Sequence, residues 1–353
     1  MVPLYKPFMP VLPELDRILH SGALAYGKYA KMFEDELKKY FGTPYLLVTS
    51  SFSSAISIAL AASGIHPNDY IIASPMACLV STQPYLANGL NVCWADIDPT
   101  TGTLSPDSVK KQVKQGVKAI VHNHFCGYPG YIDEINSIGR ENGIIVIDDG
   151  IECFGTEYKG KKIGNCGTDI TVFSLTAVRI PNCIDGGIVI FKDKECFAKG
   201  MLIRDCGIDR TMFRDNIGEI NPDCDINLIG YSATMSDVNG YIGLMQMEKV
   251  KELILMQRKN AEIWDETLVN ECFLKPLQNK NGEPNYWIYG TIAKNKRETI
   301  LYFREKGYYA SGVHINNNIY SIFGKQSINL SGVDEFYRGF VALPCGWWMK
   351  NED

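Results

Sequence analysis

Short apolar runs alternate with segments of helical periodicity along the N-terminal half of the chain. The apolar runs predict β-strands at residues 45–48, 70–73, 92–96, 119–122, 144–148, 170–173 and 188–191. Apolar positions at helical spacing predict helices at residues 31–40, 55–63, 80–88, 106–115 and 131–142. Strands that alternate with helices in this way predict an α/β fold with a large, doubly wound, mostly parallel sheet.

The C-terminal half has a different pattern. Residues 195–235 are polar, rich in Asp and weakly periodic, which predicts a long connection of the kind that usually serves a function or an interface. Residues 235–255 predict a long helix that continues to residue 269, and strands at 286–293 and 337–343 flank a helix at 298–305. We therefore expect a large α/β domain over residues 1–250 and a small C-terminal α+β domain over residues 251–353.

Composition narrows the class of protein. The 353 residues carry a net charge of −5 without a basic stripe, so nucleic acid is not an expected partner. No apolar run reaches the ~18–20 residues of a membrane span, and the N-terminus has no apolar signal-peptide core, which predicts a cytoplasmic protein. The eleven cysteines are scattered without a CxxC pair, so we expect reduced thiols and neither a disulfide framework nor a metal site.

Polar residues follow several of the predicted strands directly. Ser51 and Ser53 follow the first strand, His124 the fourth, Asp149 the fifth and Ser174 the sixth. Because ligands of such sheets bind beyond the carboxyl ends of the strands, we expect Asp148-Asp149, His124 and Ser174 to converge on one rim. The serine-rich turn before the helix at 55–63 is either an anion site at a helix N-terminus or a plain N-cap.

A single cation lies between the two last strands of this half. Arg179 follows the strand at 170–173, and Gly186 and Gly187 precede the strand at 188–191. A polar turn with one charge between two buried strands is typical of the floor of a site. The function of this predicted site therefore depends on Arg179.

These residues, taken together, resemble the DegT-type sugar aminotransferases, pyridoxal phosphate (PLP) enzymes of fold type I. The resemblance covers nearly the whole chain. It rests on the landmarks Gly27, Phe33-Glu34, Asp96-Ile97-Asp98-Pro99, His124, Gly127, Pro129, Val146-Ile147-Asp148-Asp149, Glu152, Gly155, Phe173-Ser174, Gly186-Gly187 and Met235-Ser236-Asp237 through Gln246.

The resemblance implies a role for each matching position. Asp149 matches the carboxylate that keeps the pyridine nitrogen of the cofactor protonated, although a helix cap is an equal reading of an Asp pair at a strand end. Glu152 matches the position beside the 3-hydroxyl of the ring. His124 matches a residue that lines the site, with a core histidine bonded to backbone as the alternative. The expected phosphate contacts are Ser51, Ser53 and Ser174.

Arg179 departs from the family pattern, because it stands where the family has the Schiff-base lysine. Counting forward from Ser174 and back from Gly186 places Arg179 at the same position of the family pattern, so the alignment needs no gap. A guanidinium stays protonated and delocalised, so it cannot form the covalent link or readily move the proton, and ordinary transamination should be lost. Cys78 replaces the aromatic residue that stacks on the cofactor, and Phe52-Ser53 replaces a Gly-Thr pair, where Phe52 should crowd the phosphate.

Three roles for Arg179 are open from the sequence. It binds a phosphate or carboxylate of a ligand; it forms a structural ion pair, for instance with Asp149 or Asp185; or it assists chemistry on pyridoxamine phosphate (PMP) held without a covalent bond. The related ketosugar 3-dehydratases, which replace the lysine with His and use PMP, are a partial precedent for the third role. We expect Arg179 and His124 to be the catalytic candidates, and Cys78 to line the cofactor site.

The resemblance also implies a substrate and an assembly. It implies a nucleotide-linked keto-sugar of surface polysaccharide biosynthesis and a homodimer with shared sites, which the 195–235 connection would complete. The candidate substrate contacts are Arg204, Arg210, His314, Asn316 and Tyr320. For the arginines, the alternative is that they are solvated charges of a surface loop. Two functions remain: an enzyme that holds PLP or PMP non-covalently, and a cofactor-free pseudo-enzyme that binds or regulates an active paralogue.

Overall fold

The chain folds around a seven-stranded sheet. A computed structural model describes residues 1–279, 282–324 and 328–349, and the strand order of this sheet is β1-β9-β8-β5-β4-β2-β3. Strand β9 runs antiparallel to both of its neighbours, and the other strands are parallel. The strands are β1 (Leu46–Thr49), β2 (Tyr70–Ala73), β3 (Asn91–Trp94), β4 (Val117–Asn123), β5 (Ile145–Asp149), β8 (Ile170–Ser174) and β9 (Gly187–Phe191).

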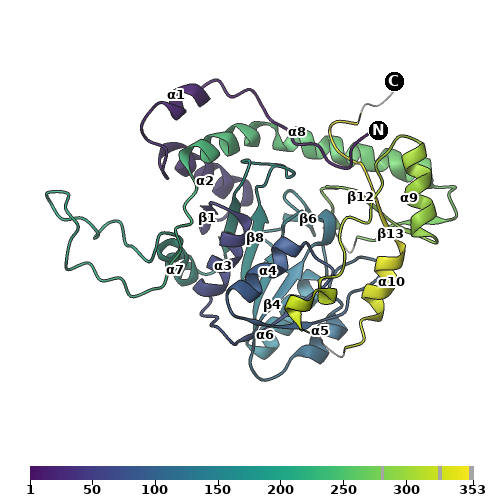
Figure 1. Cartoon of the computed structure of the whole chain (residues 1–353), viewed down its shortest axis with the longest axis horizontal. Coiled ribbons are helices and arrows are strands. Elements are labelled where there is room, and N and C mark those ends of the chain that lie inside the picture. The colour runs from purple at the N-terminus through teal and green to yellow at the C-terminus, as the bar shows by residue number, and fades with distance from the viewer. Residues whose placement is uncertain (280–281, 325–327, 350–353) are drawn as a thin grey trace.

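Helices cover both faces of this sheet (Figure 1). Leu47 and Ile71 point toward one face, and the adjacent Val48 and Ile72 point toward the other, because successive side chains of a strand alternate. The first face carries α3 (Phe52–Ala62), α4 (Leu79–Ala87) and α7 (Lys194–Arg204). The second carries α2 (Lys28–Phe41), α5 (Pro106–Gln112), α6 (Ile132–Asn142) and α8 (Asp237–Leu268). The prediction of a doubly wound, mostly parallel α/β sheet is confirmed.

Helix α8 links the sheet to the C-terminal part. Ser236 caps it by accepting the Asn239 N–H at 3.1 Å, and its first half packs on α2. The predicted domain boundary between residues 250 and 251 falls within this continuous helix. The C-terminal part has a second sheet, β10-β12-β13. Its elements are β10 (Leu274–Pro276), β12 (Tyr289–Ala293), β13 (Phe340–Leu343), α9 (Lys296–Glu305) and α10 (Ser331–Gly339).

The first residues of the chain lie against this C-terminal part. The Val2 N–H donates to the Gly307 carbonyl at 2.6 Å, and the Val2 carbonyl accepts the Tyr309 N–H at 2.9 Å. The remaining elements are short: α1 (Leu15–Leu19), η1 (Phe125–Gly127), β6 (Glu157–Tyr158), β7 (Lys161–Lys162), β11 (Gly282–Glu283), η2 (Asn317–Ile319) and η3 (Ser321–Phe323).

Two predicted boundaries were wrong. The long connection does not begin at residue 195, because α7 occupies Lys194–Arg204, with Asp193 accepting the Glu195 and Cys196 N–H groups at its start. The predicted strand at 337–343 begins at Phe340, since the preceding residues close α10. The segment after α7, teal in Figure 1, extends away from the body. No helix in the described ranges is both long and apolar enough to cross a membrane.

Candidate active site

The strand register places the predicted polar residues along one edge of the sheet. Asn123, the last residue of β4, pairs with Asp149, the last residue of β5. Farther along, Ser174 at the end of β8 pairs with Gly187, which pairs with Thr49 at the end of β1. The carboxyl ends of the parallel strands therefore form one rim, as the order of strands and polar residues predicts.

Asp149 is a buried carboxylate with an unused oxygen. Its side chain is 1% exposed, and Oδ1 accepts the Ile151 N–H at 3.1 Å. Oδ2 has no hydrogen-bond partner among the described residues. Burial raises the pKa of Asp149 to about 6, although the nearby Ser81 hydroxyl and the Ile151 N–H favour the charged form; the charge of Glu152 adds to the rise. A buried carboxylate oxygen of this kind fits a ligand that supplies an N–H or a positive charge.

Glu152 is a buried carboxylate whose oxygens are well used. One oxygen accepts the Cys126 N–H at 2.8 Å, and the other lies 2.9 Å from His314 Nε2 and 3.5 Å from Arg179 Nη2. Burial favours the neutral acid, but His314, Arg179 and the Cys126 N–H outweigh it and hold the pKa of Glu152 below its ordinary value. His314 thus joins the C-terminal part to the rim of the large sheet.

Arg179 lies in the segment between β8 and β9 and is 7% exposed. Its guanidinium lies over the Trp287 indole, with Cζ 4.4 Å from the ring centroid, and Trp287 Nε1 donates to the Val178 carbonyl at 3.0 Å. Its ionic neighbour is Glu152, not the Asp149 or Asp185 named as sequence alternatives. Nε and Nη1 of Arg179 are buried without a partner among the described residues.

A cavity of about 560 Å³ opens beside Arg179. Cys78 and His314 also line it, which brings together three of the predicted site residues. Burial and the charge of Glu152 raise the pKa of Cys78 to about 11, so this thiol stays protonated at neutral pH. The cavity wall is completed mainly by Met1, Pro3, Leu4, Tyr5, Val178, Trp287, Tyr309, Ser311 and Val313.

The serine turn before α3 is capped internally. Ser51 Oγ accepts the Ser54 N–H at 3.1 Å, so Ser51 is the N-cap of α3, and Ser53 is exposed. Ser174 is buried, and its hydroxyl lies 3.0 Å from that of Thr176. The side chain of Phe52 packs into the core beside the sheet and is 1% exposed. The expected crowding by Phe52 is therefore wrong, and the structure shows the plain N-cap that was the alternative for this turn.

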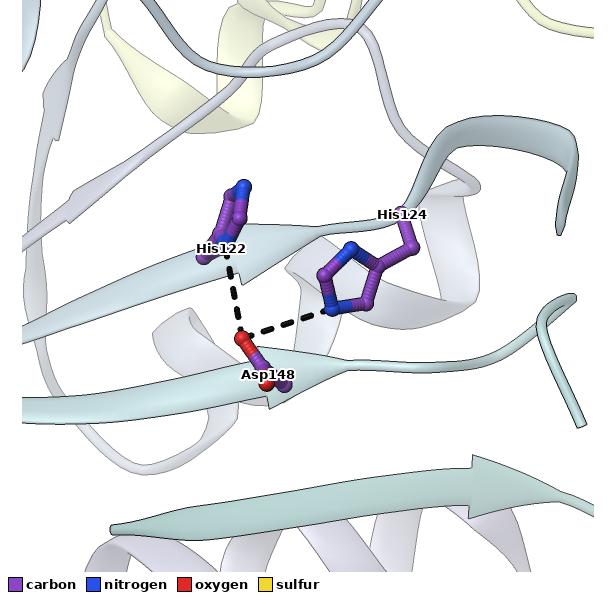
Figure 2. Close-up of side chains that lie close together, drawn as sticks. All are labelled: His122, His124 and Asp148. Atoms are coloured by element: carbon purple, nitrogen blue, oxygen red, sulfur yellow. Dashed lines mark hydrogen bonds and ion pairs between the residues drawn. The ribbon is translucent and has the colours of Figure 1, made fainter. Parts of the chain in front are cut away.

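His124 lies in a separate buried cluster with His122 and Asp148 (Figure 2). Nδ1 of His124 accepts the Gly130 N–H at 3.1 Å, and its Nε2 lies 3.4 Å from Asp148 Oδ1. Nδ1 of His122 lies 3.3 Å from the same oxygen. His124 lines neither the cavity beside Arg179 nor a smaller one that Arg179 lines together with Glu152 and Ser174. The structure thus gives His124 the backbone-bonded core position that was its alternative.

The other predicted substrate contacts lie apart from this cavity. Arg204 is buried in an ion pair with Glu34, and also donates to the Val48 carbonyl at 2.9 Å. Arg210 is bonded to both carboxylate oxygens of Asp205 at 2.6 Å. Arg204 and Arg210 share a second cavity of about 630 Å³ next to α7. Neither cavity lining includes Asn316 or Tyr320.

Sequence reasoning missed several residues of the cavity, above all Trp287. Trp287 holds the guanidinium of Arg179, and its ring stacks with Tyr5 at a centroid distance of 5.8 Å. Tyr309 and Ser311 complete the wall. No local motif marks these residues, because they reach the rim only through the packing of the chain ends against the sheet.

Comparison with known proteins identifies the family of the chain and similar structures. Residues 11–353 match the DegT/DnrJ/EryC1/StrS aminotransferase family. The sugar aminotransferase CalS13 of Micromonospora echinospora has a similar structure, with a TM-score of 0.94, 26% identity, and coverage of 100% of this chain and 97% of that chain.

Two further relatives are similar over nearly their whole lengths. AtS13 of Actinomadura melliaura has a TM-score of 0.93 and 28% identity, with coverage of 100% of this chain and 96% of that chain. The spore coat polysaccharide biosynthesis protein SpsC of Bacillus subtilis is 24% identical, over 97% of this chain and 91% of its own length.

Proposed function

Because the chain belongs to the DegT/DnrJ/EryC1/StrS aminotransferase family, we propose that it acts on a nucleotide-linked keto-sugar in surface polysaccharide biosynthesis and holds PLP or PMP without a covalent bond. The family is one of PLP- or PMP-dependent sugar aminotransferases. The names of CalS13, a sugar aminotransferase, and SpsC, a polysaccharide biosynthesis protein, support the substrate class. A cytoplasmic location is part of this proposal.

The observation that carries the proposal is the unused oxygen of Asp149. Oδ2 is buried and unpartnered among the described residues, and a pyridinium N–H is the kind of donor that it lacks. The N-terminus of α3 and the buried hydroxyl of Ser174 lie on the same rim and fit a phosphate group. These residues fit the two ends of the cofactor, which when bound supplies an electron sink for the substrate.

Arg179 gives this site a chemistry of its own. Its guanidinium offers donors and a fixed charge, but it neither bonds covalently to the cofactor nor accepts a proton. His314 lines the same cavity and is held by Glu152 at 2.9 Å. We assign the role of general acid and base at this site to His314, because an imidazole ring can both accept and donate a proton.

The segment after α7 supports the homodimer that is part of the proposal. It carries large apolar side chains with high exposure: Met212 (56%), Ile217 (79%), Ile220 (61%) and Ile229 (91%). Apolar side chains gathered on one extended segment are typical of a surface that another chain covers. In the homodimer this segment would reach the neighbouring protomer beside the cavity that Arg204 and Arg210 line.

Cofactor retention tests the proposal. The purified protein is incubated with PLP or PMP and desalted, and absorbance between about 300 and 430 nm is recorded. We expect the protein to retain the cofactor absorbance and Asp149→Asn to weaken it. Reduction with borohydride should not link the cofactor covalently to the wild-type protein. Arg179→Lys should allow PLP to become fixed at residue 179, which mass spectrometry after borohydride detects.

A second candidate function follows from the substitutions at Arg179 and Cys78. These two residues leave the ring without its lysine and its stacking aromatic, which favours a cofactor-free protein that binds or regulates an active paralogue. Absence of retained absorbance with both PLP and PMP would exclude the first function and leave this one.

A further inference from the structure

The guanidinium of Arg179 is a buried cation with two donor atoms that lack a hydrogen-bond partner in the described parts of the protein. Nε and Nη1 have no hydrogen-bond partner, and the side chain is only 7% exposed. The ionic contact with Glu152 spans 3.5 Å, longer than the roughly 2.7–2.9 Å of a charge-assisted hydrogen bond. Glu152 is also shared with His314 and the Cys126 N–H. Because unpaired buried donors of a charged group are costly, an acceptor from a ligand is expected here.

The cavity beside Arg179 points to the kind of acceptor. Its volume of about 560 Å³ is that of a small-molecule site. Of the described residues that line it, none carries a carboxylate, and Arg179 is the one side chain of fixed charge. The walls are otherwise largely apolar or aromatic, with Tyr5, Trp287 and Tyr309 among them. A lining with a fixed cationic side chain and no carboxylate favours an anion.

We propose that Arg179 binds a carboxylate of the substrate, so that the sugar is an acidic one, such as a nucleotide-linked uronic acid. The sugar class rests on the proposed function, whereas the carboxylate rests on Arg179 and its cavity. A guanidinium matches a carboxylate with two parallel donors. A phosphate dianion fits less well, because Glu152 already offsets part of the charge of Arg179.

A matched pair of ligands tests the assignment. UDP-glucuronate and UDP-glucose differ in the group at one sugar carbon, and calorimetric titration of each into the cofactor-free full-length protein compares their affinities. We expect UDP-glucuronate to bind at least about tenfold more tightly, the scale of a hydrogen bond to a charged group. Arg179→Gln should equalise the two ligands. Arg140→Gln, which removes an exposed arginine of α6 bonded to Ser137, should keep the preference.

Other results would overturn the assignment. Equal affinity in the wild type, no binding of either ligand, or a preference that persists in Arg179→Gln would each contradict a carboxylate at Arg179. Inorganic phosphate that displaces UDP-glucuronate from the wild type but not from Arg179→Gln would assign the site to phosphate instead. The titrations use cofactor-free protein, so they do not depend on the test of cofactor retention. If the protein fails to retain PLP or PMP, the proposed function is excluded, and the preference for a carboxylate can still be measured.

Discussion

Asp148 and Asp149 are consecutive residues at the end of β5, and their environments are opposite. Both are buried, at 0% and 1% exposure. Asp148 points to the α6 side of the sheet, where burial is outweighed by His124 and His122, which hold its pKa below the ordinary value. Asp149 points to the α3 side, where burial dominates and raises its pKa to about 6. Because the two side chains are almost equally buried, the difference in pKa comes from their neighbouring groups.

The difference separates a structural carboxylate from one that awaits a partner. One oxygen of Asp148 serves two rings, which ties β4 to β5 on the second face (Figure 2). One oxygen of Asp149 is satisfied by backbone, and the other has no partner in the described ranges. A protein that keeps an unpaired carboxylate buried gives up stability at that position, and such positions concentrate at functional sites.

Removing Asp148 should have the largest effect. Asp148→Ala leaves two buried imidazole rings without their shared acceptor, so we expect the free energy of unfolding to fall by about 3 to 5 kcal/mol. Urea denaturation followed by circular dichroism measures the loss. Asp148→Asn is the control, since its amide oxygen keeps part of the contact and should restore part of the stability. A loss below about 1 kcal/mol in Asp148→Ala would remove the contrast between the two aspartates.

Neutralising Asp149 should have the opposite sign. Its folded pKa of about 6 lies above the unfolded value of about 3.9, so above about pH 6 the cofactor-free folded protein bears the cost of a buried charge. Asp149→Asn should therefore stabilise the cofactor-free protein by about 2 kcal/mol near pH 8, and the gain should shrink as the pH falls toward about 4. Thermal unfolding across this pH range measures it. A variant that is less stable than the wild type near pH 8 would contradict an uncompensated Asp149.

Glu152 sharpens the comparison, because it lies near Asp149 but is fully partnered. Its lowered pKa means that its stabilising contribution is present above the unfolded pKa, about 4.3, and is lost as the pH falls through the folded value. Glu152→Gln should cost about 1.5 kcal/mol near pH 7 and progressively less below about pH 4. Urea denaturation at the two pH values checks this. A cost that does not change with pH would show that packing, not charge, is what Glu152 contributes.

The sheet and its rim could be predicted from the sequence because they depend on local patterns. The alternation of strands and helices is enough to place the polar ends of β1, β5 and β8 on one rim, and the family resemblance places Arg179 among them. Helix α7 was missed, since Gly200 interrupts it and Met201 faces solvent, so its apolar stripe is weak. The orientation of Phe52 into the core was likewise not readable from its neighbours in sequence.

The rest of the site depends on contacts between distant segments. Trp287 and His314 reach Arg179 and Glu152 only after the C-terminal part packs on the rim, and no spacing along the chain encodes that. The position of His124 depends on the neighbouring strand, because Asp148 draws it into the core cluster. These residues needed the tertiary structure, whereas Asp149 and Ser174 did not.

The contact between Glu152 and His314 has an evolutionary consequence. It joins a residue of the sheet rim to one that lies 162 positions away in the chain, and the same Glu152 oxygen lies 3.5 Å from Arg179. A substitution at either position removes a partner of the other, so single changes should be selected against and paired changes tolerated. Among relatives that carry arginine at the position of Arg179, we expect positions 152 and 314 to vary together, and among relatives that retain lysine we expect them to be free of this constraint.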